Sequence, residues 1–163
     1  MNSISKTKGV ARYVILDVAV VAVACLIPTV SHLTALPLYM LNPMLALLLA
    51  GMLLGRDWRN ALVLAVLMPL VSCLVVGMPT APKMVCMIAE LATVAGMFHV
   101  LSRRWAVLPS VLVSILAAKV VYYALKAVII APDVLIGTAW WMQLGAVLLW
   151  GGVFAALKLR VKS

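Results

Sequence analysis

Long apolar stretches separated by short polar breaks dominate the chain. Six such stretches are present, each close to the roughly 20 mostly apolar residues that a helix needs to cross a bilayer. Glycine, proline and charged residues mark the breaks, and proline resists continuing a helix. The pattern predicts an all-α integral membrane protein, a compact bundle of six transmembrane helices. In this single domain, residues 1–163, the expected helices cover residues 13–30, 37–55, 61–77, 83–101, 106–130 and 134–157.

The composition strengthens the membrane assignment. Hydrophobic residues make up 67% of the 163 residues and charged residues only 10%, and the mean hydropathy is +1.22. Soluble domains are roughly half apolar and a quarter charged, so the sequence excludes an ordinary soluble domain. The chain also contains no glycine-rich phosphate-binding loop of the P-loop type. We therefore expect no ATPase activity in the chain itself.

The distribution of basic residues predicts how the helices are oriented. The net charge of +9 does not indicate nucleic-acid binding, because the basic residues cluster at the ends of the apolar segments. Cytoplasmic loops carry an excess of lysine and arginine. Lys83 alone falls on the opposite side, so we expect both termini and two basic loops in the cytoplasm. The basic residues on that side are Lys6, Lys8, Arg12, Arg56, Arg59, Arg103, Arg104, Lys158, Arg160 and Lys162.

Ionisable residues inside the expected spans are candidates for function, because each costs roughly 2.5–3.5 kcal/mol on insertion scales. Counted inward from the outer ends of their helices, Glu90 and Lys126 lie at similar depths, about 8–10 Å below the outer surface. They predict either a polar cavity open to the outside, with Tyr122 on its wall, or a purely structural Glu90–Lys126 pair. Lys119 lies deeper, at the floor of such a cavity or reaching toward the inner interface. We expect Asp17 to pair locally with Arg12.

Asn42 and Pro43 give the second segment an unusual start. Asparagine before proline is typical of an N-cap followed by the first helical residue. A helix that begins there has only about 13 residues before Gly55, which is too short to cross a bilayer. Two alternatives follow: a helix start that faces a water-filled cavity, where it would attract anions, or one continuous helix with a proline in its outer turn.

Catalytic motifs are absent from the sequence. There is no H-E-x-x-H pair, no G-x-S-x-G elbow and no pair of cysteines at metal-ligand spacing. With only four acidic residues in the chain, we predict that the protein is not an enzyme and binds no metal or other cofactor itself.

The sequence resembles the substrate-binding S component of energy-coupling factor (ECF) vitamin transporters. The resemblance rests on the size and number of spans and on three motifs. The motifs are Gly51-Met52-Leu53-Leu54-Gly55-Arg56, the outer turn Gly77-Met78-Pro79-Thr80-Ala81-Pro82, and Met87-Ile88-Ala89-Glu90-Leu91-Ala92, which resembles the family's P-x-M-x-E run. The Ala-x-x-x-Ala signature that the family carries in its first span is missing, and Ala19 and Ala22 are an imperfect substitute.

The resemblance implies capture of a water-soluble vitamin or related micronutrient from outside a bacterial or archaeal cell. A transmembrane coupling subunit and two cytoplasmic ABC ATPases would be the partners, and the ATPases would use the ATP. The cluster of lysines favours a carboxylate-bearing vitamin such as pantothenate, biotin or folate, whereas Glu90 would suit a ring N–H or an amine. The predicted substrate-binding residues are Lys83, Glu90, Tyr122, Lys126, Asn42, Tyr39, Trp140 and Gln143.

Small residues at helical spacing predict close helix contacts. Ala19 and Ala22 in the first segment, with Gly51 and Gly55 in the second, are the candidates for docking a partner, although the same patterns also serve internal packing. Two other functions compete with vitamin capture. A scaffold of the rod-shape-determining type would hold Glu90 in a dry pair, and a small proton-coupled transporter would rest on Glu90 and an inverted repeat.

Overall fold

The computed structural model describes residues 3–34, 42–53, 58–130 and 140–162, and their side chains over residues 14–31, 33, 42–53, 58–130 and 144–158. Throughout these residues the fold is helical, with no strand. The six helices are α1 (Ser3–Thr34), α2 (Pro43–Leu53), α3 (Trp58–Val76), α4 (Ala81–Leu101), α5 (Val107–Ile129) and α6 (Trp140–Lys162). The predicted all-α class is confirmed.

Four stretches are long and apolar enough to cross a membrane: Val14–Ser31 within α1, and the whole of α3, α4 and α5. Two shorter apolar helical stretches accompany them, α2 and residues 144–158 of α6. The outer faces are strongly apolar, since Leu33 is 82% exposed and Val128 84%. Apolar side chains with no protein neighbour are what lipid contact requires, and the helices indicate a multi-pass membrane protein.

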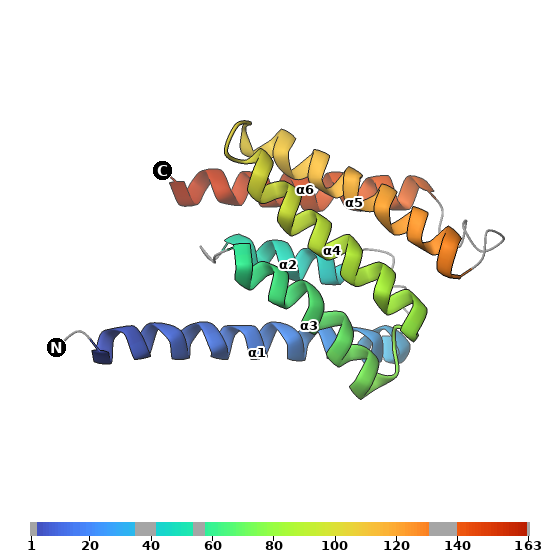
Figure 1. The fold of residues 1–163 in the computed structure, drawn as a ribbon, viewed down its shortest axis with the longest axis horizontal. Coiled ribbons are helices and arrows are strands. Elements are labelled where there is room, and N and C mark those ends of the chain that lie inside the picture. Colours follow the sequence, from blue (N-terminus) through green and yellow to red (C-terminus); the bar gives the residue numbers. More distant parts are fainter. Residues whose placement is uncertain (1–2, 35–41, 54–57, 131–139, 163) are drawn as a thin grey trace.

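Successive helices run in alternating directions through the molecule. The start of α1, the end of α6 and the turn between α4 and α5 all lie toward one end, on the left in Figure 1, and the turn between α3 and α4 lies at the other. Helix α4 packs between α3 and α5, while α1 packs on α3 and α6 on α5. In this order of packing, α1 lies at the edge of the molecule.

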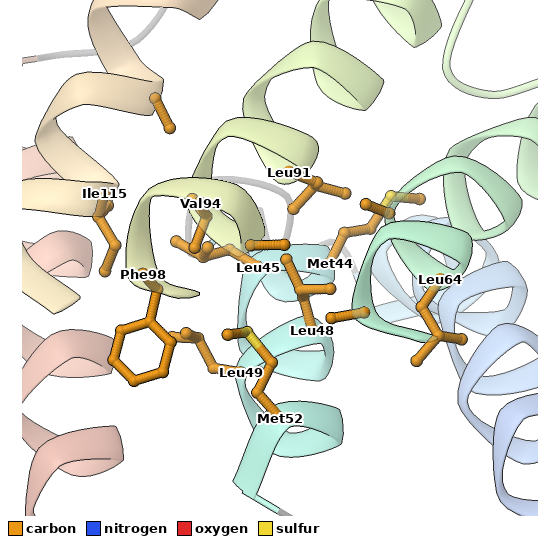
Figure 2. Close-up of a cluster of buried hydrophobic side chains, with 14 of the residues drawn as sticks. Met44, Leu45, Leu48, Leu49, Met52, Leu64, Leu91, Val94, Phe98 and Ile115 are labelled. Atoms are coloured by element: carbon orange, nitrogen blue, oxygen red, sulfur yellow. The ribbon is translucent and has the colours of Figure 1, made fainter. Parts of the chain in front are cut away.

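The short helix α2 fills the centre of the molecule, where it contacts α1, α3 and α6. Its buried residues include five large apolar side chains, which Figure 2 shows facing α3, α4 and α5. Their neighbours there are Leu64 of α3, three residues of α4 and Ile115 of α5. Such a helix, apolar on nearly every side, belongs inside a larger bundle. The five side chains are Met44, Leu45, Leu48, Leu49 and Met52.

The start of α2 agrees with the sequence prediction. The helix begins at Pro43 and has 11 residues, or about 16 Å at 1.5 Å per residue. That is about half of the 30 Å hydrocarbon core of a bilayer. Asn42 is non-helical, with a φ of 48°, so the alternative of one continuous helix through the expected span 37–55 is wrong at this residue. Residues 35–41 and 54–57 lie outside the described part of the chain.

Candidate functional site

The candidate site is a group of polar side chains at the point where α2, α4 and α5 meet. Glu90 of α4 is only 3% exposed. Its Oε1 atom lies 2.6 Å from Nζ of Lys119 on α5 and accepts a hydrogen bond of 2.9 Å from Nδ2 of Asn42, the residue before α2. A buried carboxylate is costly unless it is paired and hydrogen-bonded. One oxygen of Glu90 therefore joins three separate parts of the chain.

Asn42 plays two parts in this arrangement. Its backbone carbonyl accepts hydrogen bonds from the amides of Leu45 (3.0 Å) and Ala46 (3.3 Å), which completes the first turn of α2. Its φ of 48° lies in the left-handed region, which asparagine tolerates better than most residues. The Nδ2 group of its side chain donates to Glu90, 48 residues away. Of the two alternatives for this segment, the structure has the helix start at Pro43, and the contact of the Asn42 side chain with Glu90 was not among the expectations.

The cationic partner of Glu90 is Lys119, and not Lys126 as the paired alternative expected. The turn between α4 and α5 sets this register. Glu90 lies 11 residues before Leu101, where α4 ends, and Lys119 lies 12 residues after Val107, where α5 begins. Both residues are therefore about 17 Å from the turn at 1.5 Å per residue. The same count places Lys126 and Lys83 at equal distances from the turn, about 10 Å further from it than Glu90 and Lys119.

Aromatic side chains extend the site along α5. The Lys119 ammonium lies 5.5 Å from the centre of the Tyr122 ring, within the range of a cation–π contact. Tyr122 in turn meets Tyr123 edge to face, at 5.4 Å between ring centres. Lys126, Tyr122 and Lys119 follow one another on a single face of α5 at spacings of four and three residues. All three are half-buried.

The remaining predicted substrate-binding residues are less well placed or lie outside the described side chains. Lys83 is exposed in the first turn of α4. Tyr39 falls in the undescribed stretch 35–41. Trp140 and Gln143 belong to α6, but their side chains lie outside the described set.

The predicted docking residues divide into two groups. Gly51 is buried, and a Cβ atom added there would lie 3.3 Å from Cδ1 of Leu64 on α3, so this glycine serves internal packing. Ala19 and Ala22 are exposed on α1, and this surface remains open to a partner or to lipid. Gly55 falls outside the described residues.

A second group of polar side chains lies toward the end of the molecule that holds the turn between α4 and α5. Asn60 of α3 donates a hydrogen bond of 3.2 Å to Oδ1 of Asp17 on α1. Nearby in sequence, the Trp58 ring stacks on His99 of α4 at 5.0 Å, and Nη2 of Arg103 donates to Nε2 of His99 at 2.8 Å. The side chain of Arg12, the partner expected for Asp17, is not among the described ones.

Sequence reasoning left Lys119 out of the substrate-binding set and did not foresee Asn42 as a partner of Glu90. For Lys119, the register of the α4–α5 hairpin was the available signal. For Asn42, the sequence offered only a polar residue at a helix start. Among the described residues, no three histidine, cysteine or acidic side chains lie close enough together to hold a metal ion.

No family model, curated protein or solved structure matches this chain. The functional interpretation therefore rests on the geometry of the site.

Proposed function

We propose that this chain is a membrane-embedded binding subunit that captures a small water-soluble micronutrient from outside the cell. In this proposal all six helices lie within the membrane and both termini are cytoplasmic. The end of the molecule that holds the start of α1 and the α4–α5 turn (Figure 1) carries Arg103 and Arg104. An excess of basic residues at the cytoplasmic ends of membrane helices supports this orientation.

One observation carries the proposal, the Glu90–Lys119–Asn42 cluster in the middle of apolar helices. Glu90 is nine residues from the start of α4 and 11 from its end, so it lies near mid-membrane in this orientation. Ionisable residues at that depth are expensive and usually mark a substrate or ion pathway. Tyr122 and Lys126 continue the polar face of α5 toward the outer surface, which gives a water-soluble ligand a route from outside to the cluster.

The resemblance to S components of ECF transporters supplies the partners. The chain would work with a transmembrane coupling subunit and two cytoplasmic ABC ATPases in a bacterial or archaeal cell membrane. It would bind no cofactor and catalyse no reaction itself, because the ATPases would use the ATP. The exposed Ala19 and Ala22 on α1 offer a small-residue surface on which the coupling subunit would dock.

One observation favours a second function, a non-transporting membrane scaffold. The Glu90 side chain is 4% exposed and already holds Lys119 at 2.6 Å, as a purely structural pair between helices would. In a scaffold the pair would fix the helix arrangement and meet no ligand. Ligand binding therefore separates the two functions.

Titration of the purified protein in nanodiscs tests the proposal. Tryptophan fluorescence would be followed while pantothenate, biotin, folate or thiamine is added, with an Arg104→Gln variant as the control for charge lost at the opposite end. We expect saturable quenching by one vitamin, equal in the wild type and in the control. No response to any vitamin would favour the scaffold.

A further inference from the structure

Among the described residues, the second oxygen of the Glu90 carboxylate has no hydrogen-bond donor. Both contacts of this side chain, from Lys119 and from Asn42, go to Oε1. Within the described part of the chain, no donor reaches Oε2. Buried polar atoms are nearly always hydrogen-bonded, and this residue is only 3% exposed. An acceptor left open in the centre of the molecule marks the place where a ligand would donate a hydrogen bond.

The charges around this oxygen restrict the donor. The negative charge of Glu90 is already balanced by the Lys119 ammonium, 2.6 Å from Oε1. A cationic ligand group would add an uncompensated positive charge beside Lys119 in a poorly solvated place, where such repulsion is strong. A neutral N–H, as in an amide, a urea or a heterocycle, would complete the hydrogen bonding of Glu90 without adding charge.

The outer end of the α5 face that carries Lys119 favours a negatively charged ligand group. Lys126 lies seven residues beyond Lys119, about 10 Å further along α5. Among the described residues it has no carboxylate within ion-pair distance. Lys126 is half-buried and follows Lys119 and Tyr122 on one face of α5, the face whose Lys119 meets Glu90 of α4. Lys83 lies at the same level, so the described residues at this end carry two positive charges.

The ring of Tyr122 lies between the two polar ends. Tyr122 is three residues after Lys119 and four before Lys126, which places it on the same face. The ring is half-buried and packs against Tyr123 at 5.4 Å. It offers a flat surface against which the body of an elongated ligand can pack.

We infer that the seam between α4 and α5 selects small monoanionic carboxylic acids about 10 Å long that carry a neutral N–H group at the far end from the carboxylate. The N–H donates to Oε2 of Glu90, the middle of the ligand lies on Tyr122, and the carboxylate meets Lys126. This inference rests on the proposed function and narrows its substrate class.

Matched probe pairs test the charge requirement. Pantothenate and pantothenol differ by a carboxylate in place of an alcohol, and biotin and biotinamide by a carboxylate in place of an amide. Thiamine, a cation without a carboxylate, is the opposing probe. In the wild type we expect one acid to bind roughly tenfold or more tightly than its neutral counterpart, because a charged hydrogen bond contributes about that much. Thiamine should not bind.

Two variants test which residue contacts each end of the ligand. Lys126→Gln should remove the preference for the acid, so that the two dissociation constants become equal, while Arg104→Gln should preserve it. Glu90→Gln should weaken acid and neutral probe by the same factor. If Glu90→Gln fails to fold, Lys126→Gln still decides, because Lys126 is half-buried and holds no ion pair among the described residues.

The outcomes separate this inference from the function beneath it. Binding of thiamine, equal binding of acid and neutral probes, or an unchanged preference in Lys126→Gln would overturn the inference and leave a binding subunit in place. No binding of any probe would overturn both.

Discussion

Two of the four acidic residues in this chain accept a hydrogen bond from an asparagine on a neighbouring element, yet their surroundings differ. Asp17 of α1 receives Asn60 at 3.2 Å and is half-buried. Glu90 of α4 receives Asn42 at 2.9 Å, is 3% exposed and also holds Lys119. Asp17 lies three residues from the end of its apolar stretch, which begins at Val14, whereas Glu90 lies in the middle of α4.

The comparison shows how depth determines what a carboxylate requires. A half-buried acid near the end of a span still reaches water, and its hydrogen bond contributes little beyond local order. An acid near mid-membrane requires a cation and a further donor, or it becomes neutral. A charged pair at that depth adds little stability, since apolar residues of similar volume would pack as well. The Glu90 cluster is therefore the better candidate for function.

The largest expected effect comes from removing one partner of the deep pair. Glu90→Leu leaves the half-buried Lys119 ammonium without its counterion, and breaking a buried pair on one side costs about 3–5 kcal/mol. Asp17→Leu should cost less, about 1 kcal/mol, because Asp17 is half-buried near the end of its apolar stretch, where hydrogen bonds and ion pairs contribute about that much. Unfolding by sodium dodecyl sulfate in mixed micelles measures both. Equal losses for the two variants would remove the distinction between the regions.

A smaller effect is expected at the two asparagines. Asn42→Ala loses a hydrogen bond to a buried carboxylate, about 1.5–3 kcal/mol, and places alanine at a φ of 48°, which adds about 1 kcal/mol of strain. Asn42→Gly is the matched control, because it loses the amide but accepts the backbone. Asn60→Ala should cost less than either, about 1 kcal/mol. The same unfolding assay ranks them, and Asn60→Ala as the most costly change would contradict the account.

The smallest effect on stability is expected on the open face of α1. Ala19→Leu and Ala22→Leu place larger apolar side chains on an exposed surface, so the free energy of unfolding should change by no more than about 0.5 kcal/mol. If this face docks the coupling subunit, the same variants should abolish uptake of the bound vitamin into cells while leaving binding to the purified protein unchanged. Unchanged uptake would rule out docking through these alanines.

The helical pattern and the start of α2 could be predicted from the sequence, because both depend on local signals. Apolar runs mark the helices, and the Asn42-Pro43 pair marks a helix start whatever surrounds it. The pairing of Glu90 with Lys119 was open to prediction, but the paired alternative named Lys126 as the partner. Depth was counted from the open ends of two helices of unequal length, whereas the tight turn at residues 102–106 fixes the register at the closed end.

Other contacts depend on how the chain folds back on itself. Asn42 meets Glu90 across 48 residues, and Asn60 meets Asp17 across 43. No spacing in the sequence links such pairs, because the connections between helices set which faces meet. The central position of α2 is of the same kind. Its apolar composition indicates burial, but only the packed structure shows that it contacts α1, α3 and α6.

The central claim is that the Glu90–Lys119 pair serves ligand binding and not stability alone. The double variant Glu90→Leu with Lys119→Met tests it most directly, because replacing both partners of a buried pair by apolar residues of similar volume is often neutral for stability. Native mass spectrometry of gently purified wild type and double variant would measure any bound small molecule. We predict a vitamin-sized adduct on the wild type that is absent from an equally stable double variant. An adduct retained by the double variant, or none on either protein after incubation with the vitamins, would contradict the claim.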